Sequence, residues 1–348
     1  MASEIEEVAG ADFRQFDVVT DYSDHLFALK PDKKAAECFA DARSVVYKKI
    51  MQEWKILVDN LPEGIYVRTY ESRIDLLRAV ILGTKGTPYH DGLFFFDIAF
   101  PGDYPTSPPK VYYRSFGLRV NPNLYACGRV CLSILNTWSG TKCEKWSPER
   151  SSILQILVSI QALVLNAKPY YNEPGLKPGP NYKAYNEKVF ALTCKTMYFT
   201  LRAPPRHFEE FVTAHFCQRA CSILKAIDAY KNGAALVGYF YNEQHAASTK
   251  RLKVSKSFVK DSEDLYKLLF TEFSKIKAPG LDDLSPSLTQ LASNGTPGTA
   301  AGYPPQATSM KNGPRNTIVG YLWSKAKKVF KIGQAKSSPK SCDFSLKS

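Results

Sequence analysis

The chain has 348 residues, of which 44% are hydrophobic and 23% are charged, with 46 Lys and Arg against 33 Asp and Glu. Such a composition is ordinary for a globular protein with a sizeable core, and no apolar run is long enough to cross a bilayer. Because residues 1–12 are acidic, a secretory signal is excluded as well, and we expect a cytosolic or nuclear protein without a transmembrane segment.

Residues 1–34 are predicted to form an N-terminal extension. Its first twelve residues are small and acidic, which is typical of disorder. The rest carries enough apolar side chains to dock on another surface. It would serve either as a brace or short strand against the core or as a partner-binding motif, and we favour the brace. These apolar residues are Phe13, Phe16, Val18, Val19, Tyr22, Leu26 and Phe27.

Residues 35–202 are predicted to form the core. Residues 35–60 have the spacing of an amphipathic helix, with Ile50, Trp54 and Leu57 three or four residues apart. Four segments rich in β-branched and aromatic residues follow, separated by turn-forming Gly, Pro and Asp, and such short consecutive strands indicate an antiparallel meander. The four strands are expected at residues 64–69, 76–82, 93–100 and 110–114.

Helices are predicted for much of the second half of the chain. Residues 151–165 are mostly apolar and predict a buried helix, for which Ser147 and Pro148 would supply the N-cap and the first-turn proline. Another core helix and a helical extension over residues 203–277 follow. The later helices are expected at residues 181–201, 205–231 and 262–276. The predicted fold class is therefore α+β, with a four-stranded antiparallel meander flanked by helices.

Residues 278–348 are predicted to form a flexible linker and a basic tail. The linker, residues 278–314, is rich in Pro, Gly, Ser, Thr and Ala. From His245 onward 17 Lys and Arg stand against seven Asp and Glu, so most of the net charge of +13 lies outside the core, which argues against nucleic-acid binding. Residues 317–332 predict a basic amphipathic segment that would bind an anionic membrane or a partner's groove, dock on the core, or stay in solvent.

A loop motif between the strands and the buried helix carries the candidate chemistry. Asn121, Pro122 and Asn123 form a turn signal, and Cys131 follows eight residues after Asn123. A solvent-reachable thiol can carry an acyl group, and a side-chain amide beside it can stabilise the oxyanion that forms. The other interpretation makes Cys131 a small buried hydrophobe and Asn123 a turn residue that bonds its own backbone.

Flanking motifs extend this pattern. Residues 100–105 read Phe-Pro-Gly-Asp-Tyr-Pro, residues 108–111 read Pro-Pro-Lys-Val, and residues 146–148 read Trp-Ser-Pro. In this order around the Asn-Pro-Asn loop and its cysteine, they resemble the ubiquitin-conjugating enzyme family over roughly residues 40–200. Asn121 stands where that family usually has histidine. This departure, together with an insertion after the cysteine, is most similar to the large hybrid conjugating/ligase subgroup.

The resemblance implies a role for each residue of the site. Cys131 would accept ubiquitin as a thioester from an activating enzyme and pass it to a substrate lysine. Asn123 would stabilise the oxyanion or organise the loop, which Asn121 and Pro122 would support. Glu173 would orient the lysine amine and accept its proton, and its other interpretation is an ordinary surface acid.

The resemblance also implies surfaces for the activating enzyme and for ubiquitin ligases. Thr106 stands where many members have an aromatic residue, which disfavours a standard RING-type contact and agrees with direct substrate selection by the hybrid subgroup. The residues of these surfaces are Lys48, Lys49, Pro105, Thr106, Trp146, Ser147 and Pro148.

Two alternatives stay open: an inactive variant of the fold that only holds ubiquitin or a ligase, and an enzyme for another ubiquitin-like modifier. No cofactor is expected, because residues 83–86 lack the spacing of a phosphate loop and the activating enzyme would use the ATP. No metal is expected either. Cys217 and Cys221 lie one helical turn apart near His215, but their apolar neighbours favour a helix core, and the eight cysteines favour free thiols in a reducing compartment.

Overall fold

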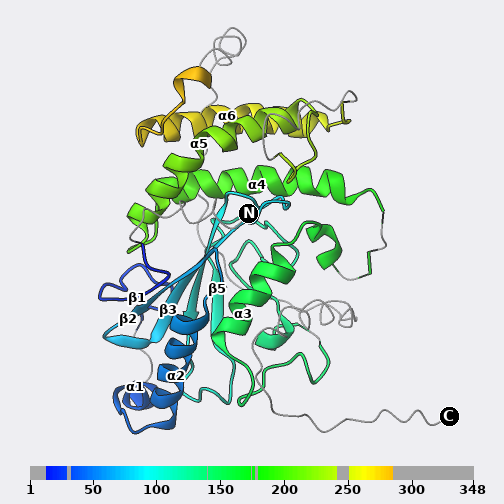
Figure 1. Ribbon diagram of the computed structural model, residues 1–348. Coiled ribbons are helices and arrows are strands. Elements are labelled where there is room, and N and C mark those ends of the chain that lie inside the picture. The colour runs from blue at the N-terminus through cyan, green and yellow to red at the C-terminus, as the bar shows by residue number, and fades with distance from the viewer. Residues whose placement is uncertain are drawn as a thin grey trace, which may run out of the picture.

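The computed structural model describes most of the chain up to residue 284 (Figure 1). The described residues are 13–29, 33–138, 140–173, 175–176, 179–240 and 251–284. The predicted disorder of residues 1–12, the predicted basic segment at residues 317–332 and nearly all of the predicted linker therefore lie outside them. None of the described helices combines the length and the apolar character needed to cross a membrane.

The described residues form a five-stranded sheet in which successive strands lie side by side. The strands are β1 Phe16–Val19, β2 Ile65–Tyr70, β3 Arg73–Leu82, β4 Leu93–Ala99 and β5 Lys110–Tyr113. Strands β2 to β5 pair in antiparallel fashion, as the four-stranded meander predicted. Strand β1 adds a fifth, parallel to β2, with Phe16 beside Val67. The N-terminal extension thus covers the edge that β2 would otherwise expose.

Helices pack on both sides of this sheet. In the described part of the chain they are α1 Lys33–Ala40, α2 Val45–Asn60, α3 Ile153–Ser159, α4 Tyr182–Arg202, α5 Glu209–Lys231 and α6 Lys256–Lys275. Shorter helical turns cover Ser133–Leu135, Ile160–Val164, Pro169–Asn172 and Asp282–Leu284. The last of these turns lies inside the predicted linker, where Leu281 is buried against the C-terminal helices.

Several helix starts differ from the sequence prediction, and α5 begins at Glu209 instead of residue 205 and α6 at Lys256 instead of residue 262. The expected helix over residues 35–60 is divided, because the Ser44 hydroxyl accepts a hydrogen bond from the Tyr47 amide and begins a new helix. The N-cap of α3 is Ser152, not Ser147. Its hydroxyl accepts from the Gln155 amide, and the Gln155 side chain accepts from the Ser152 amide, which is a capping box.

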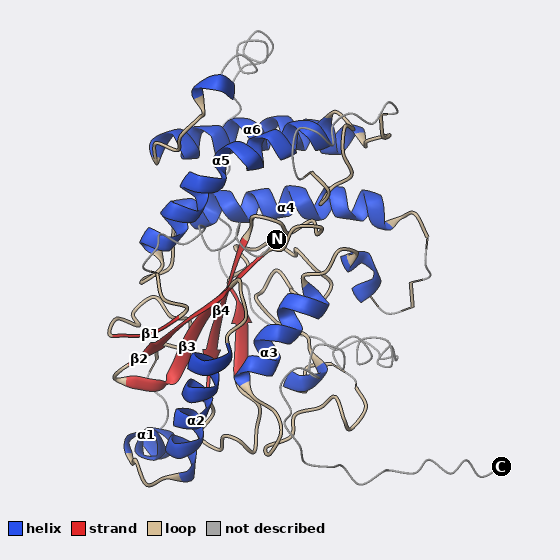
Figure 2. Cartoon of the chain, in the orientation of Figure 1, coloured by secondary structure: helices blue, strands red, loops and turns tan. Residues whose placement is uncertain are grey.

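Alternate side chains of the strands bury opposite faces of the sheet. On one face Ile81 and Phe96 join a hydrophobic cluster with α2 and α3. On the other face Val80 and Phe95 join the cluster of α4, α5 and α6, the stack of helices in the upper part of Figure 2. The rings of Phe95 and Phe208 meet there with centroids 5.2 Å apart. The C-terminal helices therefore share a hydrophobic cluster with the sheet.

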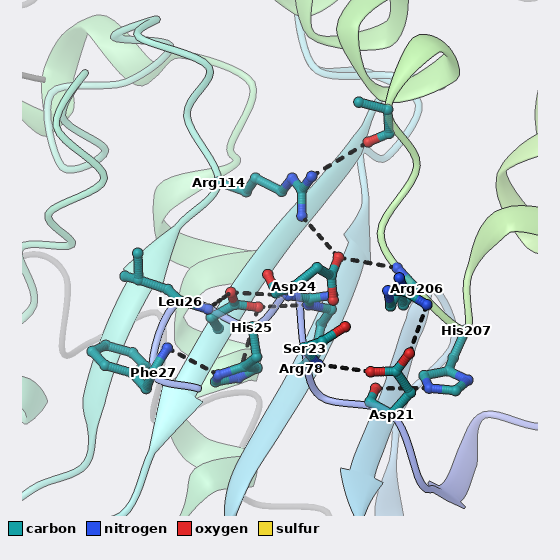
Figure 3. A network of polar contacts seen from close by, with 12 residues as sticks. Asp21, Ser23, Asp24, His25, Leu26, Phe27, Arg78, Arg114, Arg206 and His207 are labelled. Carbon is teal, nitrogen blue, oxygen red and sulfur yellow. Dashed lines mark hydrogen bonds and ion pairs between the residues drawn. The ribbon is translucent and has the colours of Figure 1, made fainter. Parts of the chain in front are cut away.

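A buried arginine ties the N-terminal extension to this second face (Figure 3). Arg78 of β3 donates from Nε and Nη2 to the two carboxylate oxygens of Asp97, at 2.6 and 3.0 Å. Its Nη1 donates to Asp24 at 2.7 Å, and Asp24 also accepts from the backbone amide of Arg206 between α4 and α5. Burial acts to raise the pKa of Asp24, but Arg78, the Arg206 amide and Arg114 together outweigh burial and the pKa is lowered. Through Arg78 and Asp24, the network thus joins the sheet, the N-terminal extension and the chain between α4 and α5.

Replacing Arg78 with methionine is expected to lower the free energy of unfolding by about 3–5 kcal/mol, because Asp97 and Asp24 lose their counter-charge. Methionine keeps much of the apolar volume of the arginine side chain. The control is Arg43→Met, since Arg43 and its partner Asp41 are 92% and 46% exposed and little change is expected. Urea unfolding measures both variants, and equal losses would refute a special role for the buried network.

Candidate active site

The loop with the Asn-Pro-Asn motif folds back on itself through isolated β-bridges. The Cys131 amide donates to the Asn123 carbonyl oxygen at 2.9 Å. Gly128 turns the chain between them at a φ of +82°, and a Cβ at this position would lie 1.9 Å from the ring of Tyr112. Asn123 and Cys131, eight residues apart in the sequence, are therefore neighbours.

Asn121 anchors the loop to the protein interior. Its side chain is fully buried, and its Nδ2 donates to the Tyr89 hydroxyl at 2.7 Å and to the Val164 carbonyl oxygen at 2.8 Å. Its Oδ1 accepts from the Asn123 amide at 2.8 Å. The side-chain amide thus joins the loop to the chain that follows α3.

Asn123 lies beside the cysteine, but its bond goes to the backbone. Its Nδ2 donates to the Cys131 carbonyl oxygen at 2.9 Å. This is the geometry of the loop-organising alternative. The same nitrogen carries a second hydrogen, which is the donor that the oxyanion alternative requires. The contact therefore supports the loop-organising role, and the oxyanion role stays a prediction.

Cys131 is less accessible than the sequence predicts. The residue is only 2% exposed, which corrects the expectation of a solvent-reachable thiol. Burial raises the pKa of the thiol, although Arg129, a hydrogen bond from the Tyr125 side chain and Arg119 each act to lower it. The thiol therefore stays protonated at neutral pH in this conformation. The neighbouring Cys127 is exposed.

Glu173 lies in an ion pair that the sequence does not reveal. Its Oε2 is 3.6 Å from Nη2 of Arg119, and the two side chains are 49% and 50% exposed. The Arg119 guanidinium also lies 4.6 Å from the centroid of the Tyr125 ring and donates to the Pro122 carbonyl oxygen at 3.3 Å. Arg119 therefore connects the predicted base to the predicted loop support.

Arg119 and Tyr125 are the residues of this site that sequence reasoning missed. Both lie within four residues of the Asn-Pro-Asn motif, so their positions were available as a signal. The contacts of these residues could not be predicted from the sequence, because Arg119 and Glu173 are 54 residues apart in the chain.

In the described part of the chain, Cys217 and Cys221 of α5 do not belong to a group of side chains suited to a metal ion. His215 Nε2 bonds the Asp91 carbonyl oxygen at 2.8 Å, and Cys221 donates to the Pro279 carbonyl oxygen at 3.1 Å. Within the described ranges no three His, Cys, Asp or Glu side chains form a group suited to a metal ion.

Comparison with known proteins identifies the family. A model described as "Ubiquitin-conjugating enzyme" matches residues 49–193. The chain is also 51% identical over 271 residues to the Arabidopsis thaliana protein named "Putative ubiquitin-conjugating enzyme E2 38", covering 76% of this chain and 82% of that protein. This chain belongs to the ubiquitin-conjugating enzyme family. The resemblance drawn from the motifs is thereby confirmed.

Other members of the ubiquitin-conjugating enzyme family are longer than this chain. "Probable ubiquitin-conjugating enzyme E2 26" of Arabidopsis thaliana is 48% identical over 282 residues, which cover 79% of this chain and 51% of that protein. The chain thus matches about half of its length. The human protein named "Dual E2 ubiquitin-conjugating enzyme/E3 ubiquitin-protein ligase BIRC6" is 37% identical over 234 residues, covering 61% of this chain and 5% of that protein. Its name agrees with the predicted likeness to the hybrid subgroup.

Lys49, one of the candidate partner-binding residues of this ubiquitin-conjugating enzyme family member, pairs with a buried glutamate. Glu53 of α2 accepts from the Tyr104 hydroxyl at 2.8 Å and from the Ile153 amide at the start of α3 at 3.0 Å. Burial raises the pKa of Glu53, although these bonds and Lys49, whose Nζ is 3.6 Å away, act to lower it. Lys49 is therefore engaged within the protein, whereas Lys48 is exposed.

Two of the remaining candidate partner-binding residues, Trp146 and Pro105, are joined by a hydrogen bond. Trp146 is buried, and its Nε1 donates to the Pro105 carbonyl oxygen at 2.7 Å. Thr106 and Pro148 are exposed beside these two residues in the chain, and Ser147 is half-buried. The bond brings the proline-rich loop and the turn before α3 together, as one surface shared by both motifs would require.

Proposed function

We propose that this chain is a ubiquitin-conjugating enzyme that accepts ubiquitin as a thioester on Cys131 and transfers it to substrate lysines. The observation that carries the proposal is the loop geometry inside the matched family region, where Asn123 bonds the carbonyl oxygen of Cys131. This contact holds a side-chain amide next to the sulfur-bearing residue. A thiol with a neighbouring amide donor has the parts needed for acyl transfer.

The proposed reaction has two steps. In the first, the Cys131 thiolate attacks the carbonyl carbon of a ubiquitin thioester on the activating enzyme, a new C–S bond forms, and the activating enzyme leaves as its own thiolate. In the second, a neutral lysine amine attacks the Cys131 thioester, an amide bond forms, and the Cys131 sulfur leaves. The amine loses a proton in this step, and Glu173 is the proposed acceptor.

The proposed partners follow from this reaction. They are ubiquitin, an activating enzyme that uses ATP, protein substrates with acceptor lysines, and ubiquitin ligases at the surface around Trp146. Direct substrate selection, as in the hybrid subgroup, is part of the proposal. A cytosolic or nuclear location is proposed because both compartments keep thiols reduced. A role of the basic tail at a membrane surface stays a prediction.

Charging is the experiment that tests the function. The full chain, mixed with ATP, activating enzyme and ubiquitin, should give a 1:1 adduct that reductant removes. A conjugating enzyme of known activity, charged in parallel, controls for the activating enzyme. Absence of the adduct would favour the alternative of a binding module, which the burial of Cys131 supports. Charging only by another modifier and its own activating enzyme would select the remaining alternative.

Glu173→Gln is expected to slow the transfer of ubiquitin to free lysine by at least tenfold and to leave charging unchanged, since general bases typically contribute about 10²–10⁴. Glutamine keeps the shape of the side chain but accepts a proton poorly. Discharge of pre-charged protein is followed by non-reducing electrophoresis. The control is Glu149→Gln, another exposed glutamate. Equal discharge rates in the two variants would make Glu173 an ordinary surface acid.

A further inference from the structure

Two asparagine side chains share one carbonyl oxygen beside the candidate active site. Asn121 begins the cysteine loop, residues 121–131, and its Nδ2 donates to the Val164 carbonyl oxygen at 2.8 Å. Asn172 donates from Nδ2 to the same oxygen at 3.1 Å and to Asn121 Oδ1 at 3.4 Å. The last carbonyl groups of a helical turn lack partners within it, so the Val164 oxygen is free to accept both bonds. Asn121 and Asn172 are therefore neighbours, although they are 51 residues apart in the sequence.

A third asparagine, Asn166, fixes the orientation of the Asn172 side chain. Its Nδ2 donates to Asn172 Oδ1 at 2.7 Å and to the Leu163 carbonyl oxygen at 2.7 Å. Its Oδ1 accepts from the Lys168 amide at 2.8 Å, which closes the turn between them. The Asn172 oxygen thus faces a donor and its nitrogen faces acceptors, so only one orientation of this amide satisfies its contacts.

The turn that holds Asn172 also carries the proposed proton acceptor. Glu173 follows Asn172 directly, at the end of the turn Pro169–Asn172. On the side of the cysteine loop, Asn121 Oδ1 accepts from the Asn123 amide at 2.8 Å. The Asn123 side chain in turn donates to the Cys131 carbonyl oxygen at 2.9 Å. A continuous path of hydrogen bonds therefore leads from the residue next to Glu173 to Cys131.

The contacts of Asn172 matter more for placement than for stability. The groups that it contacts each have a second partner. The Val164 carbonyl oxygen keeps its bond from Asn121, and the Asn166 nitrogen keeps its bond to the Leu163 carbonyl oxygen. The large cost of a lost hydrogen bond arises when a buried group is left without any partner. Removing the Asn172 side chain is therefore expected to free the turn without unfolding the protein.

We propose that Asn172 is a positioning residue that ties the turn ending at Glu173 to the cysteine loop. The inference rests on the proposed function, in which Glu173 accepts a proton from the amine that attacks the Cys131 thioester. The Glu173 side chain is 49% exposed and pairs with Arg119 at 3.6 Å, a contact too weak to fix its place. Fixing the turn instead matters, because misplacing a reacting group by about 1 Å can cost on the order of a hundredfold in rate.

Asn172→Ala is expected to slow the discharge of pre-charged protein onto free lysine on the order of fivefold and to leave charging unchanged, since the contacts of one neutral side chain are lost. The control is Asn232→Ala at the end of α5, which removes an asparagine whose Nδ2 bonds Asp228 at 3.1 Å and should discharge like the wild type. A double-mutant cycle with Glu173→Gln separates positioning from general loosening. If Asn172 acts through Glu173, Asn172→Ala has no further effect in the Glu173→Gln background.

Hydrogen–deuterium exchange of the full chain tests the contact without ubiquitin. In Asn172→Ala the amides of residues 121–131 and 166–173 are expected to exchange roughly threefold faster, because the two segments lose their tie. Peptides from β3 and β4 should exchange as in the wild type. Asn232→Ala should change none of these segments.

Each outcome decides the question. Slower discharge with normal charging, absent in the Glu173→Gln background and accompanied by faster exchange in both segments, supports the proposal. Equal discharge of Asn172→Ala and Asn232→Ala, equal slowing in both backgrounds, or slower charging overturns it. A wild-type chain that never charges refutes the proposed function, and exchange then decides whether Asn172 ties the two segments. Normal charging with unchanged exchange at residues 121–131 keeps the proposed function and overturns this inference.

Discussion

Cys131→Ser is expected to convert the reductant-sensitive ubiquitin adduct into one that survives reductant, and Cys131→Ala is expected to give no adduct at all. The serine hydroxyl can form an oxygen ester, which thiols do not cleave readily, whereas alanine offers no nucleophile. Non-reducing and reducing electrophoresis of the charged variants measures both effects. This is the largest effect we expect from a single substitution, because the acyl-carrying atom itself is changed.

The matched control for this prediction is Cys127→Ser. Cys127 lies four residues earlier on the same loop and is exposed. Its variant should charge like the wild type and keep a reductant-sensitive adduct. A labile adduct on Cys131→Ala would show that another thiol, such as Cys127, carries the ubiquitin.

Asn123→Ala is expected to slow discharge onto free lysine by about a hundredfold, since loss of one oxyanion donor typically costs about 3 kcal/mol of transition-state stabilisation. Single-turnover discharge of pre-charged protein, at a temperature well below unfolding, measures the effect. A small loss of stability should accompany it, because the Cys131 carbonyl oxygen loses its partner.

Asn121→Ala is the companion to this variant. The Asn121 side-chain amide bonds Tyr89, Val164 and Asn123. Its loss should therefore lower the free energy of unfolding more, and the discharge rate less, than Asn123→Ala does. If the two variants discharge at equal rates, Asn123 acts only as an organiser of the loop and the oxyanion role is wrong.

Strands β2 to β5 could be predicted from the sequence because each depends on residue types within a short segment and on the turn residues beside it. Strands β2 to β5 are short runs of β-branched and aromatic residues between turn residues, and their consecutive order allows antiparallel pairing without crossovers. The division of the helix over residues 35–60 was also encoded locally, in the cap formed by Ser44, but apolar spacing outweighed it in the prediction. Ser152 and Gln155 likewise have the sequence pattern of a capping box, but the prediction chose the preceding Ser147 as the N-cap.

The burial of the thiol could not be predicted in the same way. Spacing placed Asn123 next to Cys131, because one short loop contains both. The 2% exposure of Cys131 depends instead on how the folded chain packs around the loop, and a sequence does not give that packing. The same holds for Arg78, whose partners Asp24 and Asp97 lie on either side of it in the sequence.

Mapping the attachment site of ubiquitin on the wild-type chain tests the central claim most directly. After charging, intact mass and peptide mapping under non-reducing conditions should locate one ubiquitin on the peptide with Cys131, and reductant should release it. Attachment to another cysteine, or solely to lysines through bonds that resist reductant, would contradict the assignment of Cys131 as the residue that carries ubiquitin.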